Sequence, residues 1–118
     1  MRSSAPEIII DSDGYPTEQS VAALEAWRPT SFDDAGLFVG WDLPEIWERT
    51  GYGTARVAID KDGQAHIFYS TGGWSGNEEL MGAVMGNFLC SYHWNAHFSG
   101  GHYIFETRLL NPQAPAND

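Results

Sequence analysis

The first half of the chain carries its apolar residues at helical spacing. They recur at every third position ahead of Pro29, so we predict a helix over 18–27. A second helix is predicted over 43–49, because Asp42 stands at its N-cap position. Residues 30–41 leave two alternatives open, a helix or an irregular connection.

Two β-hairpins are predicted in the second half. Runs 54–59 and 64–70 are rich in β-forming residues, and the Asp-Gly step between them is a strong turn signal. Runs 89–98 and 102–109 form the second pair. Between the hairpins a helix is predicted over 78–87, because its apolar residues form one stripe. That stripe consists of Leu80, Met81, Val84, Met85 and Phe88.

The second hairpin is the more informative of the two, because its faces differ. With a two-residue turn at Gly100-Gly101, Ser99 pairs with His102 and the side chains alternate between the faces. The apolar face, assigned to the core, consists of Tyr92, Trp94, Ala96, Phe98, Tyr103, Phe105, Thr107 and Leu109. The mostly polar face consists of His93, Asn95, His97, Ile104, Glu106 and Arg108. Cys90 lies two positions before Tyr92 and therefore on the same, apolar face of the predicted strand, so we expect it to be buried.

These elements predict an α+β fold: a four-stranded, largely antiparallel sheet, built from the two hairpins, with helices packed on one face. A length of 118 residues corresponds to one domain, which we expect to span 1–110. The segment 111–118 is small, polar and rich in proline, so we expect it to be a flexible C-terminal tail.

Composition narrows the classes of function. Acidic residues number 16 against 6 lysines and arginines, and the net charge at pH 7 is −10. Binding to nucleic acid or to an anionic membrane needs a cationic surface, so the charge argues against both and favours a basic partner protein. Cys90 is the only cysteine, which excludes an intrachain disulfide. Because no signal peptide or membrane-spanning run is visible, we expect a cytoplasmic protein.

Acidic and aromatic residues are interleaved in the first half, which is typical of a surface that docks into a basic protein groove. The candidate contact residues are Asp33, Asp34, Trp41, Asp42, Glu45, Trp47 and Glu48, with Phe32 among them. A solvated acidic face with the rings turned inward is the alternative. Gly82 and Gly86 form a bare ridge on one helix face. This ridge either packs on the N-terminal helix or makes an intermolecular contact, such as a homodimer.

Three short motifs carry a resemblance to known sequences. They are Asp13-Gly-Tyr-Pro-Thr17, Thr71-Gly-Gly-Trp-Ser-Gly-Asn-Glu78 and Gly100-Gly-His-Tyr103. With them, and over most of its length, the chain resembles a group of small phage and prophage proteins. Small acidic phage proteins are often inhibitors of host systems, anti-CRISPR proteins included. The resemblance implies a phage or prophage setting rather than a mechanism. Together with the net charge of −10, the small size and the lack of a complete catalytic set, this analogy favours an inhibitor that covers a basic, nucleic-acid-handling surface of a host defence protein.

A ligand- or metal-binding module, or a small enzyme, is the alternative function. The loop 72–76 precedes a helix N-terminus, where backbone N–H groups can hold an anion. Its candidate residues are Gly73, Trp74, Ser75 and Gly76, and those of the polar sheet face are His93, His97, His102 and Glu106. His93 and His97 would lie about 13 Å apart on a strand, and stable zinc sites need three or four ligands. We therefore predict no metal, no cofactor and no catalytic residue.

Overall fold

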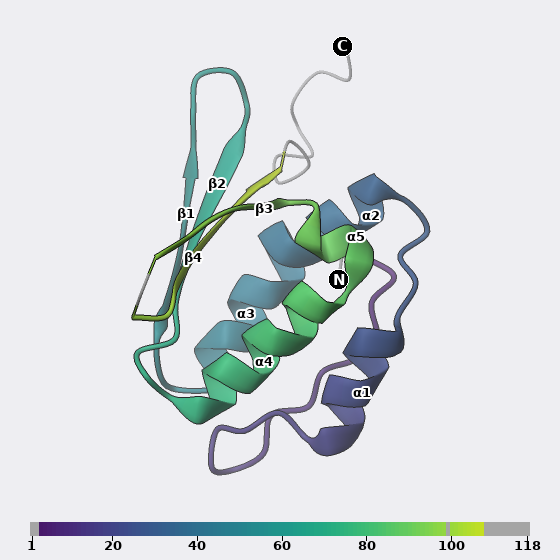
Figure 1. Ribbon diagram of the computed structural model, residues 1–118, viewed down its shortest axis with the longest axis vertical. Helices are drawn as coiled ribbons and strands as arrows, with labels where there is room; N and C mark the ends of the chain where they lie inside the picture. Colours follow the sequence, from purple (N-terminus) through teal and green to yellow (C-terminus); the bar gives the residue numbers. More distant parts are fainter. Residues whose placement is uncertain (1–2, 99, 108–118) are drawn as a thin grey trace.

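A four-stranded antiparallel sheet with helices packed against one of its faces makes up the part of the chain that the computed structural model describes, residues 3–98 and 100–107 (Figure 1). The strands lie in the order β1-β2-β4-β3. Their bounds are β1 Thr54–Ile59, β2 Ala65–Ser70, β3 Trp94–Phe98 and β4 His102–Thr107. The predicted α+β class and both hairpins are therefore confirmed. The predicted tail 111–118 lies outside the described residues.

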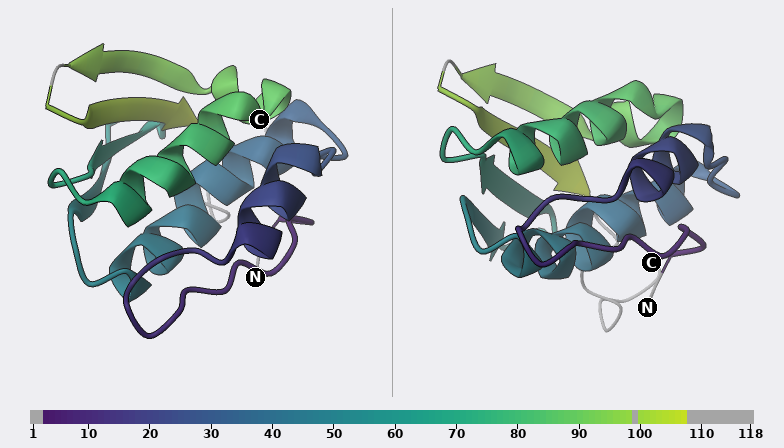
Figure 2. Two further views of the ribbon diagram at one scale, coloured as in Figure 1. Left: turned by 60° about the horizontal axis from the view of Figure 1, so that its bottom comes forward. Right: turned by 90° about the horizontal axis from the view of Figure 1, so that it is seen from below.

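One long helix crosses the sheet, with a π-helical turn in its middle (Figure 2). Its parts are α2 Phe32–Leu37, the π-helix η1 Phe38–Asp42 and α3 Leu43–Arg49. α2 contacts β4, η1 contacts β2 and β4, and α3 contacts β1. Ser31 caps the long helix, since its side chain accepts a hydrogen bond from the N–H of Asp34. Asp42 has helical dihedral angles and makes no capping bond, so our prediction that it starts a separate helix is wrong.

The remaining helices pack beside this long helix (Figures 1 and 2). They are α1 Glu18–Ala26, which packs on α4, then α4 Ser75–Gly86 and the short α5 Phe88–Ser91. α4 begins earlier than predicted, and it ends where Asn87 becomes extended (φ −89°, ψ 118°). The side chain of Asn87 then caps α5. The predicted strand 89–98 therefore begins as a helix, and only its second half is strand.

The second hairpin has a different register from the one we predicted. His102 lies opposite Phe98 rather than opposite Ser99, so the paired residues are four positions apart and the connection is not a two-residue turn. The carbonyl oxygen of Gly101 accepts a hydrogen bond from the N–H of Thr71 at 3.0 Å, which ties this glycine to the end of β2. A β-bulge near the start of β3 shifts the register once more.

The core lies between the sheet and the helices. The rings of Trp47 and Phe105 lie 5.0 Å and 5.8 Å from the ring of Tyr69. The Tyr69 hydroxyl donates to the carbonyl oxygen of Val39 at 2.6 Å, and burial raises the pKa of Tyr69 well above its ordinary value. Cys90 is buried, as predicted, although it belongs to α5 rather than to a strand. Within the described residues, no helix combines the length and the apolar character that crossing a membrane requires.

Candidate functional site

Three of the predicted contact residues lie at the surface of the long helix. Asp33, Glu45 and Glu48 are exposed. Glu45 also borders a hollow of about 260 Å³ between α3 and the N-terminal segment. The charged residues that line this hollow are Glu7, Asp42, Glu45 and Arg49. Its carboxylates outnumber its single cation, so the hollow can accept a basic side chain from a partner.

Two other predicted contact residues are buried, so their assignment to a docking surface is wrong. Trp47 is 1% exposed, and its indole N–H donates to the carbonyl oxygen of Ser70 at 3.2 Å. The Asp34 carboxylate is 8% exposed and accepts from the backbone N–H groups of Ser4 and Thr30, each at 2.9 Å. Burial acts to raise the pKa of Asp34, but hydrogen bonds from Ser4 and Thr30 outweigh it, so this pKa lies below its ordinary value.

Trp41 and Asp42 lie at the boundary between surface and core. Trp41 is half-buried and packs against the core. The half-buried carboxylate of Asp42 accepts from the backbone N–H of Ser3 at 3.3 Å and from the Ser3 hydroxyl. The part of the predicted acidic surface that a partner reaches most easily is therefore the set of three exposed carboxylates named above.

The glycine ridge on α4 is open. A Cβ at Gly82 would meet no atom within 4 Å, and a Cβ at Gly86 would meet nothing nearer than the Glu25 carboxylate at 3.9 Å. α1 packs on α4 but does not close over Gly82, so the intramolecular explanation is wrong at that position. An intermolecular contact there stays a prediction.

The loop 72–76 is packed by aromatic rings. The ring of Trp74 lies 4.8 Å from that of Tyr15 and is stacked on that of Tyr52 at 4.2 Å. The hydroxyls of Tyr15 and Ser75 form a hydrogen bond of 2.9 Å. Two of the four residues proposed for ligand binding, Trp74 and Ser75, are thus already in contact with the N-terminal part of the chain.

The other two residues of that set are glycines with different surroundings. Gly73 is exposed, whereas Gly76 is buried. A Cβ at Gly76 would lie 2.7 Å from the indole nitrogen of Trp74 and 2.9 Å from the carbonyl oxygen of Gly14. Only a glycine fits there, because two backbone segments and a ring meet at this point.

The three short motifs singled out in the sequence, 13–17, 71–78 and 100–103, meet at this corner of the molecule. Tyr15 comes from the first motif and Trp74 from the second, and Thr71 of the second donates to Gly101 of the third. Asn77 is buried there: its amide N–H donates to the Thr50 hydroxyl at 3.1 Å, and its Oδ1 has no hydrogen-bond partner within the described part of the chain. These contacts make the motifs part of the scaffold.

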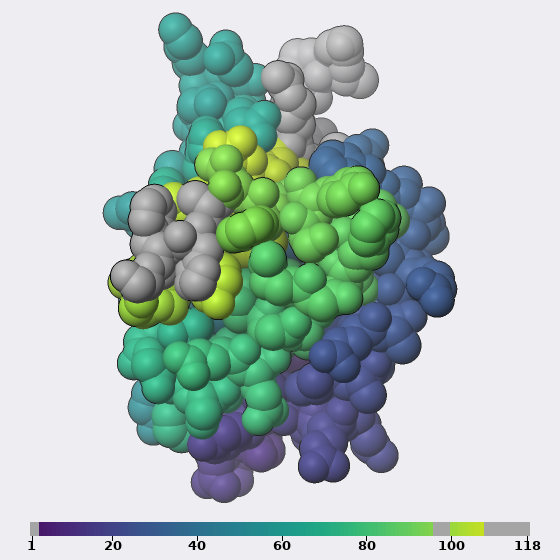
Figure 3. Space-filling view, in the orientation of Figure 1, coloured from purple at the N-terminus to yellow at the C-terminus, as the bar shows by residue number. Residues whose placement is uncertain are grey.

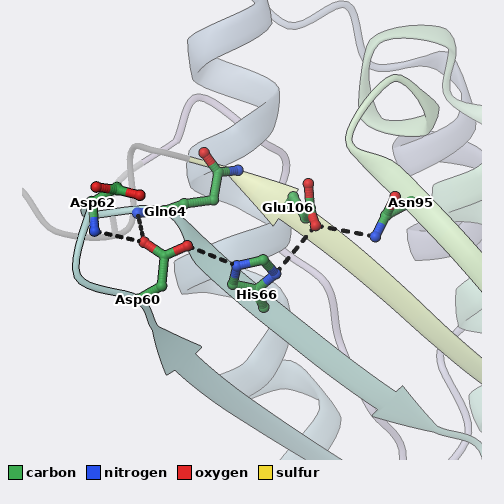
Figure 4. A network of polar contacts seen from close by, with 6 residues as sticks. All are labelled: Asp60, Asp62, Gln64, His66, Asn95 and Glu106. Atoms are coloured by element: carbon green, nitrogen blue, oxygen red, sulfur yellow. Dashed lines mark hydrogen bonds and ion pairs between the residues drawn. The ribbon is translucent and has the colours of Figure 1, made fainter.

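A histidine that the sequence patterns did not single out, His66, lies at the centre of a polar network on the outer face of the sheet (Figure 4). Its ring nitrogens lie 3.1 Å from the carboxylates of Asp60 and Glu106. The side-chain amide of Asn95 donates to Glu106 at 3.0 Å. The hydrogen bond from His66, and next that from the N–H of Gln64, hold the pKa of Asp60 below its ordinary value. Because both ring nitrogens face carboxylates, the network fastens the first hairpin to β4.

His93 is buried, so its predicted place on a solvent-facing sheet surface is wrong. β3 begins only after His93, and the imidazole packs against the long helix. The ring is stacked on that of Phe32 at 3.9 Å. Its nitrogens lie 2.9 Å from the carbonyl oxygen of Phe32 and 3.1 Å from that of Glu106. His93 thereby joins α2 to β4.

The other members of the predicted histidine face do not converge on one point. His102 is exposed, and it lies four residues from Glu106 on β4, a separation of about 13 Å at the usual rise. The side chain of His97 lies outside what the structure describes. Among residues 3–98 and 100–107, no three His, Cys, Asp or Glu side chains are placed to hold a metal ion.

A surface of which the sequence predicted only Phe32 consists of four exposed aromatic side chains. We call it the aromatic patch; its members are Phe32, Phe88, Tyr92 and Trp94, exposed by 47%, 68%, 61% and 42%. Phe88 was placed in the apolar stripe of α4, and Tyr92 and Trp94 on the core face of a strand. Both assignments are wrong: α4 ends before Phe88, and Tyr92 precedes β3. Trp94 is the first residue of β3, beside the register shift, and it is 42% exposed.

Comparisons with family models, with curated proteins and with solved structures found no match. The fold and the candidate site define an α+β protein that presents exposed carboxylates and exposed aromatic rings. Its function is therefore inferred from the charges and contacts of the chain itself.

Proposed function

We propose that the protein is a phage- or prophage-encoded inhibitor that binds a basic host protein and masks its nucleic-acid-handling surface. The observation that carries the proposal is the placement of the charge. The net charge is −10, and of the acidic residues that the structure describes, Asp34 alone is buried. Such a surface attracts a cationic groove and repels nucleic acid.

The contact surface that fits this role best is the outer side of the long helix. Glu45 and Glu48 are exposed on α3, and Glu45 shares the hollow with Asp42 and Glu7. A lysine or arginine side chain that enters the hollow would meet carboxylates around an apolar floor that includes Ile46. The ligand-binding alternative has weaker support, because the loop 72–76 is occupied by contacts with the protein's own rings.

We place the inhibitor in the cytoplasm. Cys90 is a free, buried thiol, which suits a reducing compartment where host nucleic-acid-handling proteins operate.

The test begins with affinity capture from host lysate and identification of the captured protein by mass spectrometry. The decisive measurement is the binding constant of the purified pair as a function of salt. Affinity is expected to fall steeply between about 50 mM and about 300 mM salt, because exposed charges are screened over that range. A partner whose affinity does not change with salt contradicts the proposal.

Two charge variants locate the surface. The double variant Glu45→Gln/Glu48→Gln is expected to weaken binding about threefold to tenfold. The matched control Glu78→Gln/Glu79→Gln changes the net charge equally at two exposed positions of α4, and it is expected to weaken binding less. Equal losses would mean that only total charge matters and that the long helix is not the contact surface.

A further inference from the structure

The aromatic patch is continuous across separate elements of the fold. The ring of Tyr92 lies 4.8 Å from that of Phe88 and 6.4 Å from that of Phe32. Figure 3 shows α5 (green) at the surface beside the long helix (blue). Phe32, Tyr92 and Trp94 also line a hollow of about 460 Å³. Exposed rings gathered around a hollow are typical of a surface that contacts a partner.

Buried residues under the aromatic patch hold its segments in place. His93 is 4% exposed; it stacks on the ring of Phe32, and its nitrogens lie against the carbonyl oxygens of Phe32 and Glu106. A Cβ at Gly36 would lie 2.9 Å from the His93 ring, so this glycine allows the imidazole to approach the helix. Asn87 caps the helix that carries Phe88. Buried neighbours thus fix the segments that bear the rings, which reduces the entropy lost on binding.

The charges around the hollow indicate which kind of partner group it can bind. Asp33 and Glu106 line it, and its described lining includes no lysine or arginine. A second copy of this chain is disfavoured, because two bodies with a net charge of −10 repel each other. Aromatic faces attract cations, and carboxylates at their edge strengthen that attraction. The occupant that satisfies both the rings and the charge is a cationic side chain.

We propose that the aromatic patch binds an arginine or lysine side chain of a basic protein, with the cation against the rings of Phe32 and Tyr92 and beside Asp33. The inference rests on the proposed function, because it gives the same partner a second point of contact. Asp33 and Glu48 lie near opposite ends of the long helix, about 22 Å apart at the helical rise. A basic groove that engages both would therefore run along this helix.

The probe is an acetylated tetra-arginine amide, titrated into the full chain at low salt and followed by calorimetry. Its matched probe is the tetra-citrulline peptide, which keeps the shape and loses the charge. The variants are Phe32→Leu/Tyr92→Leu and Tyr92→Leu alone, which keep apolar side chains and lose the rings. Tyr52→Leu is the control, since Tyr52 is a 51% exposed tyrosine outside the patch.

The double variant is expected to weaken tetra-arginine binding about threefold to tenfold, and Tyr92→Leu about twofold to fivefold. Tyr52→Leu should bind as the parent does, and tetra-citrulline should bind far more weakly than tetra-arginine. A urea midpoint within error of the parent confirms that each variant folds. Because Tyr92 is largely exposed, its single variant keeps the test valid if the double variant is unstable.

Three results would overturn the inference. They are an equal loss in Tyr52→Leu, equal binding of tetra-citrulline, and a parent dimer in light scattering that Tyr92→Leu converts to a monomer. The two proposals fail separately: if the captured partner loses affinity with Glu45→Gln/Glu48→Gln but not with Phe32→Leu/Tyr92→Leu, the inhibitor proposal stands and the patch inference falls. If neither variant nor salt changes that affinity, both fall.

Discussion

Asn87 joins three helices through one buried side chain. It is 2% exposed and lies between α4 and α5. Its amide N–H groups donate to the carbonyl oxygens of Leu24 at 2.9 Å and Trp27 at 2.8 Å, at the end of α1. Its Oδ1 accepts from the backbone N–H of Cys90 at 3.4 Å, which caps α5. Replacing this residue therefore tests whether these contacts stabilise the helical layer.

The expected cost of Asn87→Ala follows from those contacts. Each lost hydrogen bond costs about 0.5–1.5 kcal/mol, and a lost N-cap costs about 0.5–2 kcal/mol. We expect the free energy of unfolding to fall by about 2–4 kcal/mol, which lowers the Tm of a domain of this size by about 8–16 °C. Asn87→Asp should cost more, because a carboxylate would face two carbonyl oxygens in a buried site.

Urea unfolding, followed by tryptophan fluorescence and far-ultraviolet circular dichroism, measures this change. Asn95→Ala is the matched control, because Asn95 is exposed and its amide donates to a partly exposed carboxylate. The control should cost less than about 0.5 kcal/mol. The reasoning is refuted if Asn87→Ala costs under about 1 kcal/mol or no more than the control does.

Three further substitutions test separate features. Gly82→Ala should stabilise the protein by about 0.5–1 kcal/mol, because a Cβ there meets no atom within 4 Å and alanine favours a helix; a lower urea midpoint would contradict this. Burial raises the pKa of Cys90 from 9.0 to about 12, so its contribution to stability is complete below pH 9 and is lost as pH rises through about 12. Cys90→Ala should therefore flatten the alkaline loss of stability, and the native thiol should resist a thiol reagent. The pKa of Asp34 in the folded state lies below 3.8, so its contribution to stability is present above pH 3.8 and is lost as pH falls through the folded-state pKa. Asp34→Asn should therefore lower the free energy of unfolding near neutrality, and in urea titrations it should flatten the loss of stability at acid pH.

Elements governed by local chemistry could be predicted from the sequence. Thr17 caps α1, accepting from the N–H of Ser20, and Glu18 starts the helix. The Asp-Gly step at Gly63 joins β1 to β2, and Gly63 has a φ of +80°, which glycine adopts without strain. In each case residues within a few positions of one another supply the stabilising contact, so the pattern alone is sufficient.

The short helix α5 could not be predicted in this way, although the end of α4 was predicted to within one residue. The apolar stripe continues through Phe88, yet the helix stops at Asn87, whose hydrogen bonds reach carbonyl oxygens of α1. These hydrogen bonds join residues that lie 63 and 60 positions apart in the chain, so they leave no periodic signal in the sequence. Because residues 89–93 were assigned to a strand, Tyr92 and His93 were placed on strand faces, whereas the register of the second hairpin differs because its connection is longer than the predicted two-residue turn.

In the candidate site, too, some features could be predicted from the local sequence and others depend on the tertiary fold. The interleaved acids and rings of the first half belong to one continuous helix, whose π turn inserts an extra residue into the repeat and hides its period. Without that period, exposed Asp33 could not be separated from buried Asp34, nor exposed Glu48 from buried Trp47. Ionised side chains stay at the surface unless hydrogen bonds or opposite charges compensate their burial, as they do at Asp34, so the acidic surface was predictable in outline. An aromatic ring follows the tertiary fold, so the aromatic patch, on which we propose a second point of contact for a basic partner, becomes visible as a whole only in the structure.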